Sequence, residues 1–167
     1  GARSYEYDPD GRRTRFVNEL NGEWVYGYDG LGRLESVTDP VGEVTSYGWN
    51  GEGHLGSVTQ PGGSCTSSPK TGCVTYAYDL AGRPTGVDYA DTATPDITAI
   101  TYDAVGRRTH ASRGGDTEMW VWDQRSRLKS HTDVNARTTT YGWDATGNLV
   151  SIGYPGQTAP VTREFDD

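Results

Sequence analysis

A short phrase recurs through this chain about every 21 residues: an aromatic pair separated by one position, then Asp or Asn, two more residues and Gly. The second aromatic residue falls at 7, 28, 49, 78, 102, 122, 143 and 165, so successive copies are 21, 21, 29, 24, 20, 21 and 22 residues apart. A fixed short period indicates a repeat architecture, in which stacked copies bury a continuous stripe that one copy could not bury alone. The recurring positions are Tyr7, Asp8, Gly11, Tyr28, Asp29, Gly32, Trp49, Asn50, Gly53, Tyr78, Asp79, Gly82, Tyr102, Asp103, Gly106, Trp122, Asp123, Trp143, Asp144 and Gly147.

The residues leading into each aromatic pair predict a strand, and those after it predict a tight turn. Segments such as 44–47 and 138–141 are rich in Val, Thr and Tyr, which favour strands. Residues i and i+2 of a strand share a face, so Tyr47 and Trp49 should point the same way. In the turn, the Asp carboxylate can accept backbone N–H groups, and Gly supplies the positive φ that closes a hairpin. The sequence therefore predicts an all-β chain of tandem β-hairpins.

Two details of the repeat constrain the backbone. The residue between the aromatic pair is small at Gly27, Gly48, Ala77 and Gly142, which predicts a crowded or closely approached opposite face. Ser126 occupies the turn position that is Gly in the other six complete copies, and a side chain there should cost about 1 kcal/mol.

The strand that follows each turn carries apolar residues two and five positions after the Gly, such as Leu55 and Val58 after Gly53. A separation of three places two residues on opposite faces of a regular strand. Either both faces of the sheet are packed, or a β-bulge brings the two residues onto one face.

The composition limits the classes of protein to which this chain can belong. Only 33% of residues are apolar and the net charge is −8, a combination that by itself favours disorder. The periodic aromatic residues argue against disorder. With 23 acidic and 15 basic residues, the chain lacks the clustered positive charge that binding to nucleic acid requires. No run of roughly 18 apolar residues is present, so we expect no insertion into a membrane.

Residues 60–73 form a loop insertion in the longest copy, rich in Gly, Ser and Pro. It contains both cysteines, Cys65 and Cys73, and these lack the two further ligands of a zinc site. We expect a disulfide rather than free thiols, which would contribute about 2–3 kcal/mol by closing a short loop. A disulfide also favours an extracellular or cell-surface setting.

The repeats extend over the whole sequence. A first copy is under way at Tyr5 and an eighth copy, which begins at Arg163, is incomplete. We therefore expect residues 1–167 to be a single array of seven complete repeats and a truncated eighth, taken from a longer array. Unpaired strand edges at its two ends would favour edge-to-edge self-association.

Other residue patterns give little indication of chemistry. Asp8 and Asp10 resemble the start of a calcium loop, but Arg12 stands where the next oxygen ligand belongs. The histidines fall at unrelated repeat positions without metal-binding spacing: His54, His110 and His131. We expect no enzyme activity, with no catalytic residue, metal or cofactor.

The repeated residues resemble the YD repeat of the RHS family, written roughly as aromatic-x-Tyr-Asp-x-x-Gly-Arg-Leu-x-x-Val-Thr. The resemblance covers Tyr5 to Asp167 and recurs seven times with a nearly constant period. It implies β-hairpins joined edge to edge into a curved, twisted antiparallel ribbon, which in relatives spirals into a hollow shell. Relatives include bacterial RHS and cell-wall-associated proteins, subunits of insecticidal toxin complexes, and animal teneurins.

The resemblance implies a non-enzymatic scaffold that forms a wall segment of an RHS-type shell. Bacterial shells of the family enclose a C-terminal toxin domain, whereas teneurin shells support cell-surface adhesion. The implied partners are the rest of the same YD-repeat protein and an enclosed toxin domain, in a secreted or cell-surface bacterial protein. About 14 strands at ~4.8 Å each make a ribbon roughly 67 Å wide, enough for part of a wall but not for a container.

The family also has a self-cleaving core built on two Asp-Pro-x-Gly motifs, and residues 8–11 and 39–42 match those letters. Residues 8–11 lie in the turn inside a repeat, whereas residues 39–42 lie in the turn between repeats. Pro and Gly at these positions are ordinary β-turn choices. We therefore expect turns and not a protease.

The aromatic residues allow a second function, because exposed rings can stack on sugars. Their presence in every copy favours packing instead, since aromatic side chains dominate burial in chains with few apolar residues. In the alternative, the chain is a carbohydrate- or cell-surface-binding module and a glycan is its partner. The candidate stacking residues are Tyr28, Trp49, Tyr78, Trp122 and Trp143.

Overall fold

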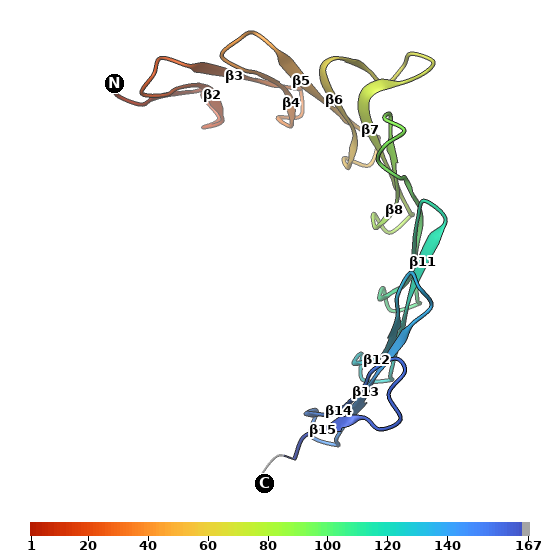
Figure 1. The fold of residues 1–167 in the computed structure, drawn as a ribbon. Coiled ribbons are helices and arrows are strands. Elements are labelled where there is room, and N and C mark those ends of the chain that lie inside the picture. Colours follow the sequence, from red (N-terminus) through yellow and green to blue (C-terminus); the bar gives the residue numbers. More distant parts are fainter. Residues whose placement is uncertain (165–167) are drawn as a thin grey trace. The chain divides into compact units, whose positions relative to one another are not determined.

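The computed structural model describes residues 1–164, and every regular element in that range is a β-strand. The chain divides into two compact units, Gly1–Thr94 with β1 to β8 and a second unit from Pro95 with β9 to β15. Within each unit, every strand pairs antiparallel with the next strand in the sequence (Figure 1). The predicted all-β fold of tandem hairpins joined edge to edge is confirmed. The expected eighth copy reaches Phe165 and Asp166, which lie outside the described residues.

The strands have the following bounds. In the first unit they are β1 (Ser4–Tyr7), β2 (Arg13–Val17), β3 (Glu23–Tyr28), β4 (Leu34–Thr38), β5 (Val44–Trp49), β6 (Leu55–Ser64), β7 (Thr71–Tyr78) and β8 (Pro84–Tyr89). In the second unit they are β9 (Ile97–Tyr102), β10 (Arg108–Arg113), β11 (Asp116–Trp122), β12 (Leu128–Thr132), β13 (Thr138–Trp143), β14 (Leu149–Gly153) and β15 (Val161–Thr162).

A β-bulge beside each turn decides how the return strand packs. In the β5–β6 hairpin, Tyr47 pairs with Val58 and Trp49 pairs with Leu55, with a register shift between Gly48 and Trp49. The bulge places both apolar residues of β6 opposite the aromatic pair of β5. The same shift occurs beside the aromatic pairs of β3, β7, β11 and β13. Of the two packings that the sequence allowed, the structure therefore has the bulged one.

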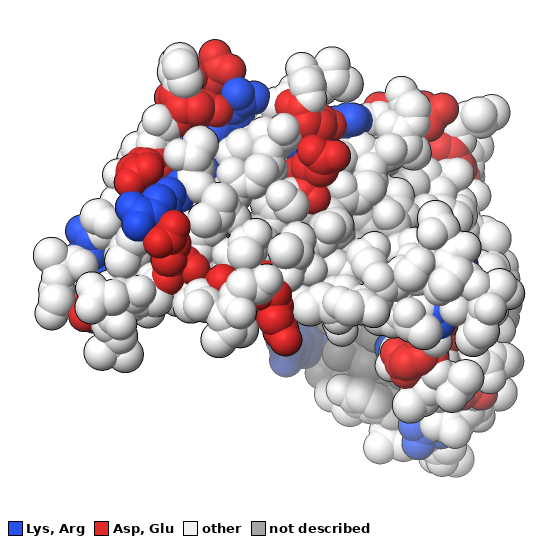
Figure 2. Space-filling view, turned by 90° about the horizontal axis from the view of Figure 1, so that it is seen from above, with Lys and Arg blue, Asp and Glu red and all other residues white. Residues whose placement is uncertain are grey.

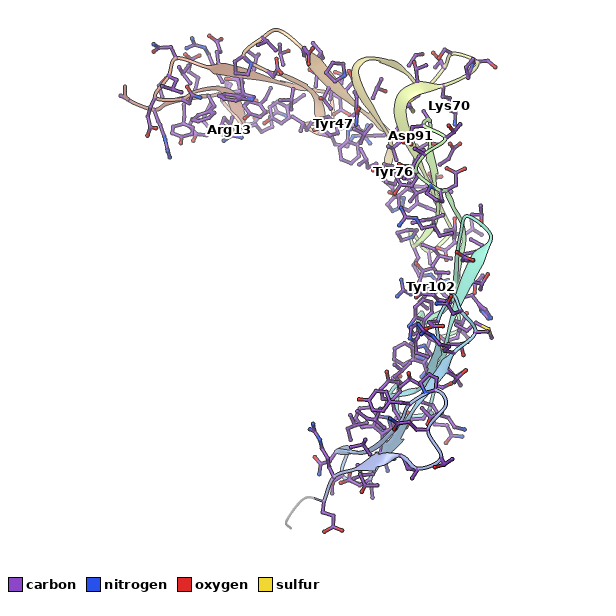
Figure 3. The ribbon with its side chains drawn as sticks, viewed as in Figure 1. Arg13, Tyr47, Lys70, Tyr76, Asp91 and Tyr102 are labelled. Atoms are coloured by element: carbon purple, nitrogen blue, oxygen red, sulfur yellow. A yellow bond between two sulfur atoms is a disulfide. The ribbon has the colours of Figure 1, made fainter. Side chains whose placement is uncertain are left out.

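The two faces of the sheet differ in chemistry. One, which we call the aromatic face, carries the aromatic pairs and the apolar residues paired with them. Figure 3 shows Tyr47 and Tyr76 on the same side of the first unit, with Lys70 on the other side. The opposite face carries small polar residues: Gly48 pairs with Ser57, and a Cβ added to Gly48 would overlap the Ser57 hydroxyl. Gly27 and Gly142 face Ser36 and Ser151 in the same way, which explains why these positions hold Gly.

The sheet is a single layer without a conventional core. Among residues 1–164, Cys73 is the only buried apolar side chain, at 3% exposed. On the face shown in Figure 2, acidic and basic side chains lie next to one another in small groups separated by uncharged residues. The described residues contain no helix that is long and apolar enough to cross a membrane. Stability must therefore come from contacts between neighbouring strands, as in other repeat proteins.

The turns inside the repeats close as their residues predict. In the turn at Asp29, the Gly32 N–H donates to the Asp29 carbonyl (2.9 Å), and Gly32 has a φ of 78°. Ser126 holds the same conformation, with a φ of 61°, despite its side chain. A turn between repeats does likewise with Ala136, which has a φ of 58° and donates its N–H to the Asp133 carbonyl (2.9 Å).

We expect Ala136→Gly to stabilise the protein by about 1 kcal/mol, because it removes an L side chain from a left-handed backbone conformation. The measurement is the midpoint of urea unfolding, followed by far-ultraviolet circular dichroism. Ala104→Gly is the matched control, since Ala104 is a turn residue outside the left-handed region. It should lower stability by about 0.5–1 kcal/mol through the entropy of Gly. Equal effects of the two changes would contradict the expectation.

Candidate functional site

The carboxylate that opens each turn organises the turn around itself. Asp29 Oδ1 accepts the backbone N–H groups of Leu31 (2.9 Å) and Arg33 (2.9 Å). Asp29 Oδ2 accepts Nε of Arg33 at 2.7 Å. The carboxylate thus holds both the loop backbone and the arginine side chain. The same three hydrogen bonds form at five other turns, which open with Asp8, Asp79, Asp103, Asp123 and Asp133.

These hydrogen bonds favour the ionised carboxylate. The Arg33 backbone N–H, assisted by the Arg33 guanidinium, holds the pKa of Asp29 below its ordinary value although partial burial acts in the opposite direction. At Asp144, burial raises the pKa, but bonds from the Asn148 backbone, Thr146, the Asn148 side chain and Gly147 outweigh it and bring the pKa to about 2.

The arginine after each turn reaches the next repeat. The Arg33 guanidinium lies over the Trp49 ring, with Cζ 5.2 Å from the ring centroid. The ring also donates a hydrogen bond backward, from Trp49 Nε1 to the Leu34 carbonyl (2.9 Å). We call this combination the inter-repeat clasp: a cationic side chain over the ring of the next repeat, and a hydrogen bond from that ring to the carbonyl of the residue after the arginine. It joins adjacent hairpins through side chains in addition to the strand ladder.

The clasp recurs in both units with little variation. In the first unit, Arg12 lies 5.1 Å from the Tyr28 centroid, and the Tyr28 hydroxyl donates to the Arg13 carbonyl (2.9 Å). The second unit contains two further clasps, Arg107 with Trp122 (5.8 Å) and Arg127 with Trp143 (5.6 Å). Trp122 Nε1 donates to Arg108 O and Trp143 Nε1 donates to Leu128 O, each at 2.8 Å.

In the second unit the arginine also ties one turn to the next. Arg107 Nη1 donates to the Asp123 carbonyl (2.8 Å), and Arg127 Nη1 donates to the Asp144 carbonyl (2.8 Å). Each guanidinium therefore binds the carboxylate of its own turn, the ring of the next repeat and the backbone of the next turn. The arginine row has a structural role and is not a free basic patch.

One clasp in the first unit is different in composition. Asn50 and His54 stand where other turns have Asp and Arg, and the His54 ring stacks on Tyr78 with centroids 4.8 Å apart. The Tyr78 hydroxyl still donates to the Leu55 carbonyl at 2.8 Å. His54 Nδ1 is buried without a hydrogen-bond partner among the described residues. This joint therefore keeps its ring contact but lacks the carboxylate–guanidinium pair.

The five candidate stacking residues are placed in these clasps. Each of them is half-buried, has one ring face against an arginine or histidine, and has its hydroxyl or indole N–H bonded to a carbonyl. A sugar could reach only what remains of each ring. The residues are Tyr28, Trp49, Tyr78, Trp122 and Trp143.

The remaining predicted groups are found in structural roles. Cys65 and Cys73 form a disulfide with Cα atoms 5.3 Å apart, which closes the loop insertion between β6 and β7. Asp8 and Asp39, which open the two Asp-Pro-x-Gly motifs, each accept N–H groups of their own turn. Within residues 1–164, no group of three His, Cys, Asp or Glu side chains is placed to hold a metal ion.

Sequence reasoning missed the backbone carbonyls that accept the hydrogen bonds of the aromatic rings. It also missed that the arginine of a clasp lies over the ring of the next repeat. It treated the arginines as a row and the aromatic residues as a stripe, without connecting them. A signal was present, because an arginine precedes four of these rings by 15 or 16 residues, as with Arg33 and Trp49.

Comparison with known proteins agrees with this repeat geometry. The family model of the RHS repeat matches residues 7–44, 28–64 and 122–159, which together cover more than half of the chain. The chain belongs to the RHS repeat family, and the predicted membership is thereby confirmed. A search of curated protein sequences found no match.

A solved structure resembles the chain in fold. A structure of the Photorhabdus luminescens Tc holotoxin pore matches with 15% identity and a TM-score of 0.50, over 92% of this chain and 11% of that chain. A crystal structure of TcdB2-TccC3-Cdc42 matches with 14% identity and a TM-score of 0.43, over 91% of this chain and 12% of that one. The chain thus spans about a ninth of the length of the first of these structures.

We expect the double change Asn50→Asp and His54→Arg to stabilise the protein by about 1 kcal/mol, because it rebuilds the carboxylate–guanidinium pair and places a cation over Tyr78. Each single change should give less, since the new side chain lacks its partner. Urea unfolding of the four proteins in a double-mutant cycle measures the coupling. Strict additivity would show that the clasp does not work as a unit.

We expect the stability of the protein to fall as the pH is lowered from about 4 to about 2. The pKa of Asp144 is lower in the folded state than its ordinary value of 3.8, so its contribution is complete above pH 4 and is lost as the pH falls through about 2. Asp144→Asn should lower stability at pH 7 and reduce the dependence on pH in this range. Urea midpoints at pH 7, 4, 3 and 2 measure both effects. An unchanged pH profile in the variant would contradict this assignment.

Proposed function

We propose that this chain is a non-enzymatic wall segment of a larger RHS-type shell, which encloses a toxin domain in a secreted or cell-surface bacterial protein. Membership of the RHS repeat family and the fold shared with a Tc holotoxin structure support this role. The toxin domain and the rest of the repeat protein are its proposed partners.

The inter-repeat clasp is the observation that carries the proposal. In the joints that contain an arginine, the carboxylate, the guanidinium and the ring N–H or hydroxyl, which could otherwise bind a ligand, are occupied in linking one hairpin to the next. The carboxylate of Asp29, for example, accepts three hydrogen bonds from its own turn, and the Arg33 guanidinium covers Trp49. Such an array extends by adding identical joints, which suits a wall whose size is set by the number of repeats.

The alternative of a glycan-binding module has less support from the same contacts. Stacking on a sugar requires an open ring face, and the clasp covers one face of each candidate ring. The ring atom that could bond a sugar hydroxyl is already bonded to a carbonyl, as at Trp49 Nε1. Adhesion to a cell surface by other parts of a shell would be compatible with the wall role.

The test is protection of the enclosed domain. In the parent protein, deletion of residues 1–167 should open the wall and raise the rate at which a protease cleaves the toxin domain by at least about tenfold, because cleavage follows the accessible population. Lys129→Ala, a change of an exposed side chain outside the clasps, is the control and should leave protection unchanged. Equal cleavage rates with and without the segment, or saturable binding of the isolated segment on a glycan array, would overturn the wall role.

A further inference from the structure

The second unit contains a cavity on its aromatic face, where β9, β10 and β11 lie side by side. Its volume is about 330 Å³, and its apolar lining includes Ile97, Ile100, Ala111 and Trp120. Ile100 pairs with Ala111, which in turn pairs with Glu118, so the three lie in one row across the sheet. This volume is at the lower end of the range for sites that bind a ligand.

The cavity exists because this repeat has lost the side chains that fill the same place elsewhere. Ala111 is the fifth residue after its turn Gly, where it is the smallest residue of all seven copies. Arg108, the second residue after that Gly, stands where four other copies have Leu. The residues equivalent to Ala111 are Phe16, Val37, Val58, Val87, His131 and Ile152.

The floor of the cavity is apolar and its rim is charged. Arg108 lies over Trp120 with Cζ 3.9 Å from the ring centroid, and Arg113 Nε donates to the Pro95 carbonyl at 3.2 Å. Asp116 pairs with Arg113 across the hairpin whose turn is Gly114-Gly115. Apart from Gly115, all of these residues line the cavity.

The fourth charge on the rim is Glu118, whose carboxylate lies 3.3 Å from Nε2 of His131. The rim thus has two guanidinium groups and two carboxylates around an apolar hollow; the Arg113 Nε already donates to the Pro95 carbonyl, and one Glu118 oxygen already contacts His131. An apolar centre inside a polar rim is the usual anatomy of a protein interface.

This distribution of charge excludes several kinds of ligand. The balance of two cations and two anions gives no preference for a simple anion, such as a fatty acid, or for a simple cation. A sugar would need an open aromatic face, but Trp120 has Arg108 on its ring and is stacked with His131, with centroids 5.1 Å apart. The rim matches a neutral polypeptide backbone. The rim carboxylates can accept hydrogen bonds from backbone N–H groups, and the rim guanidiniums can donate to backbone carbonyls.

We propose that this cavity is a binding site for a polypeptide partner that inserts one uncharged apolar side chain, of the size of Leu or Phe, between Ile100 and Trp120. Ala111 forms the bottom of the site, and the charged rim holds the main chain on either side of the inserted residue. Anchoring by a single apolar side chain in a pocket is a common way to concentrate binding energy. The site would serve such a partner whether or not the chain forms part of a shell.

The test uses the 167-residue chain with capped amino acids as probes: the N-acetyl amides of Leu, Phe, Lys and Asp. Each probe carries a neutral main-chain group and one side chain. Nuclear magnetic resonance should show saturable shifts of the Ala111 methyl and the Trp120 indole N–H with the Leu and Phe amides. The Lys and Asp amides should bind at least about tenfold more weakly, because a charged side chain would have to leave water.

The decisive variant is Ala111→Val, which restores the residue found at this position in three other copies and should therefore fold normally. By filling the hollow, it should weaken binding of the Leu and Phe amides by about tenfold or more. Val87→Ala, at the equivalent position of the first unit, is the control and should leave binding at Trp120 unchanged. No saturable shift with either apolar probe, equal binding of the charged probes, or full binding by the Ala111→Val variant would overturn the proposal.

Discussion

The structure depends on the inter-repeat clasp because a single-layer sheet has no core to hold it together. A cation over an aromatic ring contributes about 0.5–1 kcal/mol at partly exposed sites. A hydrogen bond adds about 0.5–1.5 kcal/mol. Each joint between repeats therefore contributes only modestly to stability, and the array becomes stable because the joint is repeated. Contacts such as Arg33 with Trp49 take the role that buried aliphatic side chains have in a globular domain.

The clasp also explains why the other features of the repeat are needed together. The turn carboxylate holds the arginine in the direction of the next ring, and the bulge turns both apolar residues of the return strand toward the same face as that ring. The small residue between the aromatic pair leaves room for a serine on the opposite face, as at Gly48 and Ser57. Turn, bulge, ring and Gly thus form one geometric unit.

The sequence predicted those parts of the unit that depend on local chemistry. The period of the aromatic residues, the Asp that opens each turn and the Gly that closes it all follow from residue type and spacing. The bulge did not follow, since the separation of Leu55 and Val58 was compatible with two packings and only the register decides between them. The group that accepts the hydrogen bond from Trp49 Nε1 could not be predicted either, because it is a backbone carbonyl, which every residue has. The cavity at Ala111 could be recognised only from the strand register together with a comparison of the equivalent position in all copies.

A repeat that departs from the pattern shows that stability in this array is determined locally, at each joint between neighbouring repeats. The joint with His54 in place of arginine is also the joint that the Cys65–Cys73 disulfide spans, because His54, just before β6, and Cys65, just after it, both contact residues of β7. A disulfide across a short loop contributes about 2–3 kcal/mol, which exceeds what the missing carboxylate–guanidinium pair would add. Since each repeat contacts only its neighbours, a weak joint must be reinforced where it occurs and cannot be offset by strength elsewhere in the array. The loop insertion is thus best understood as part of the joint that it follows.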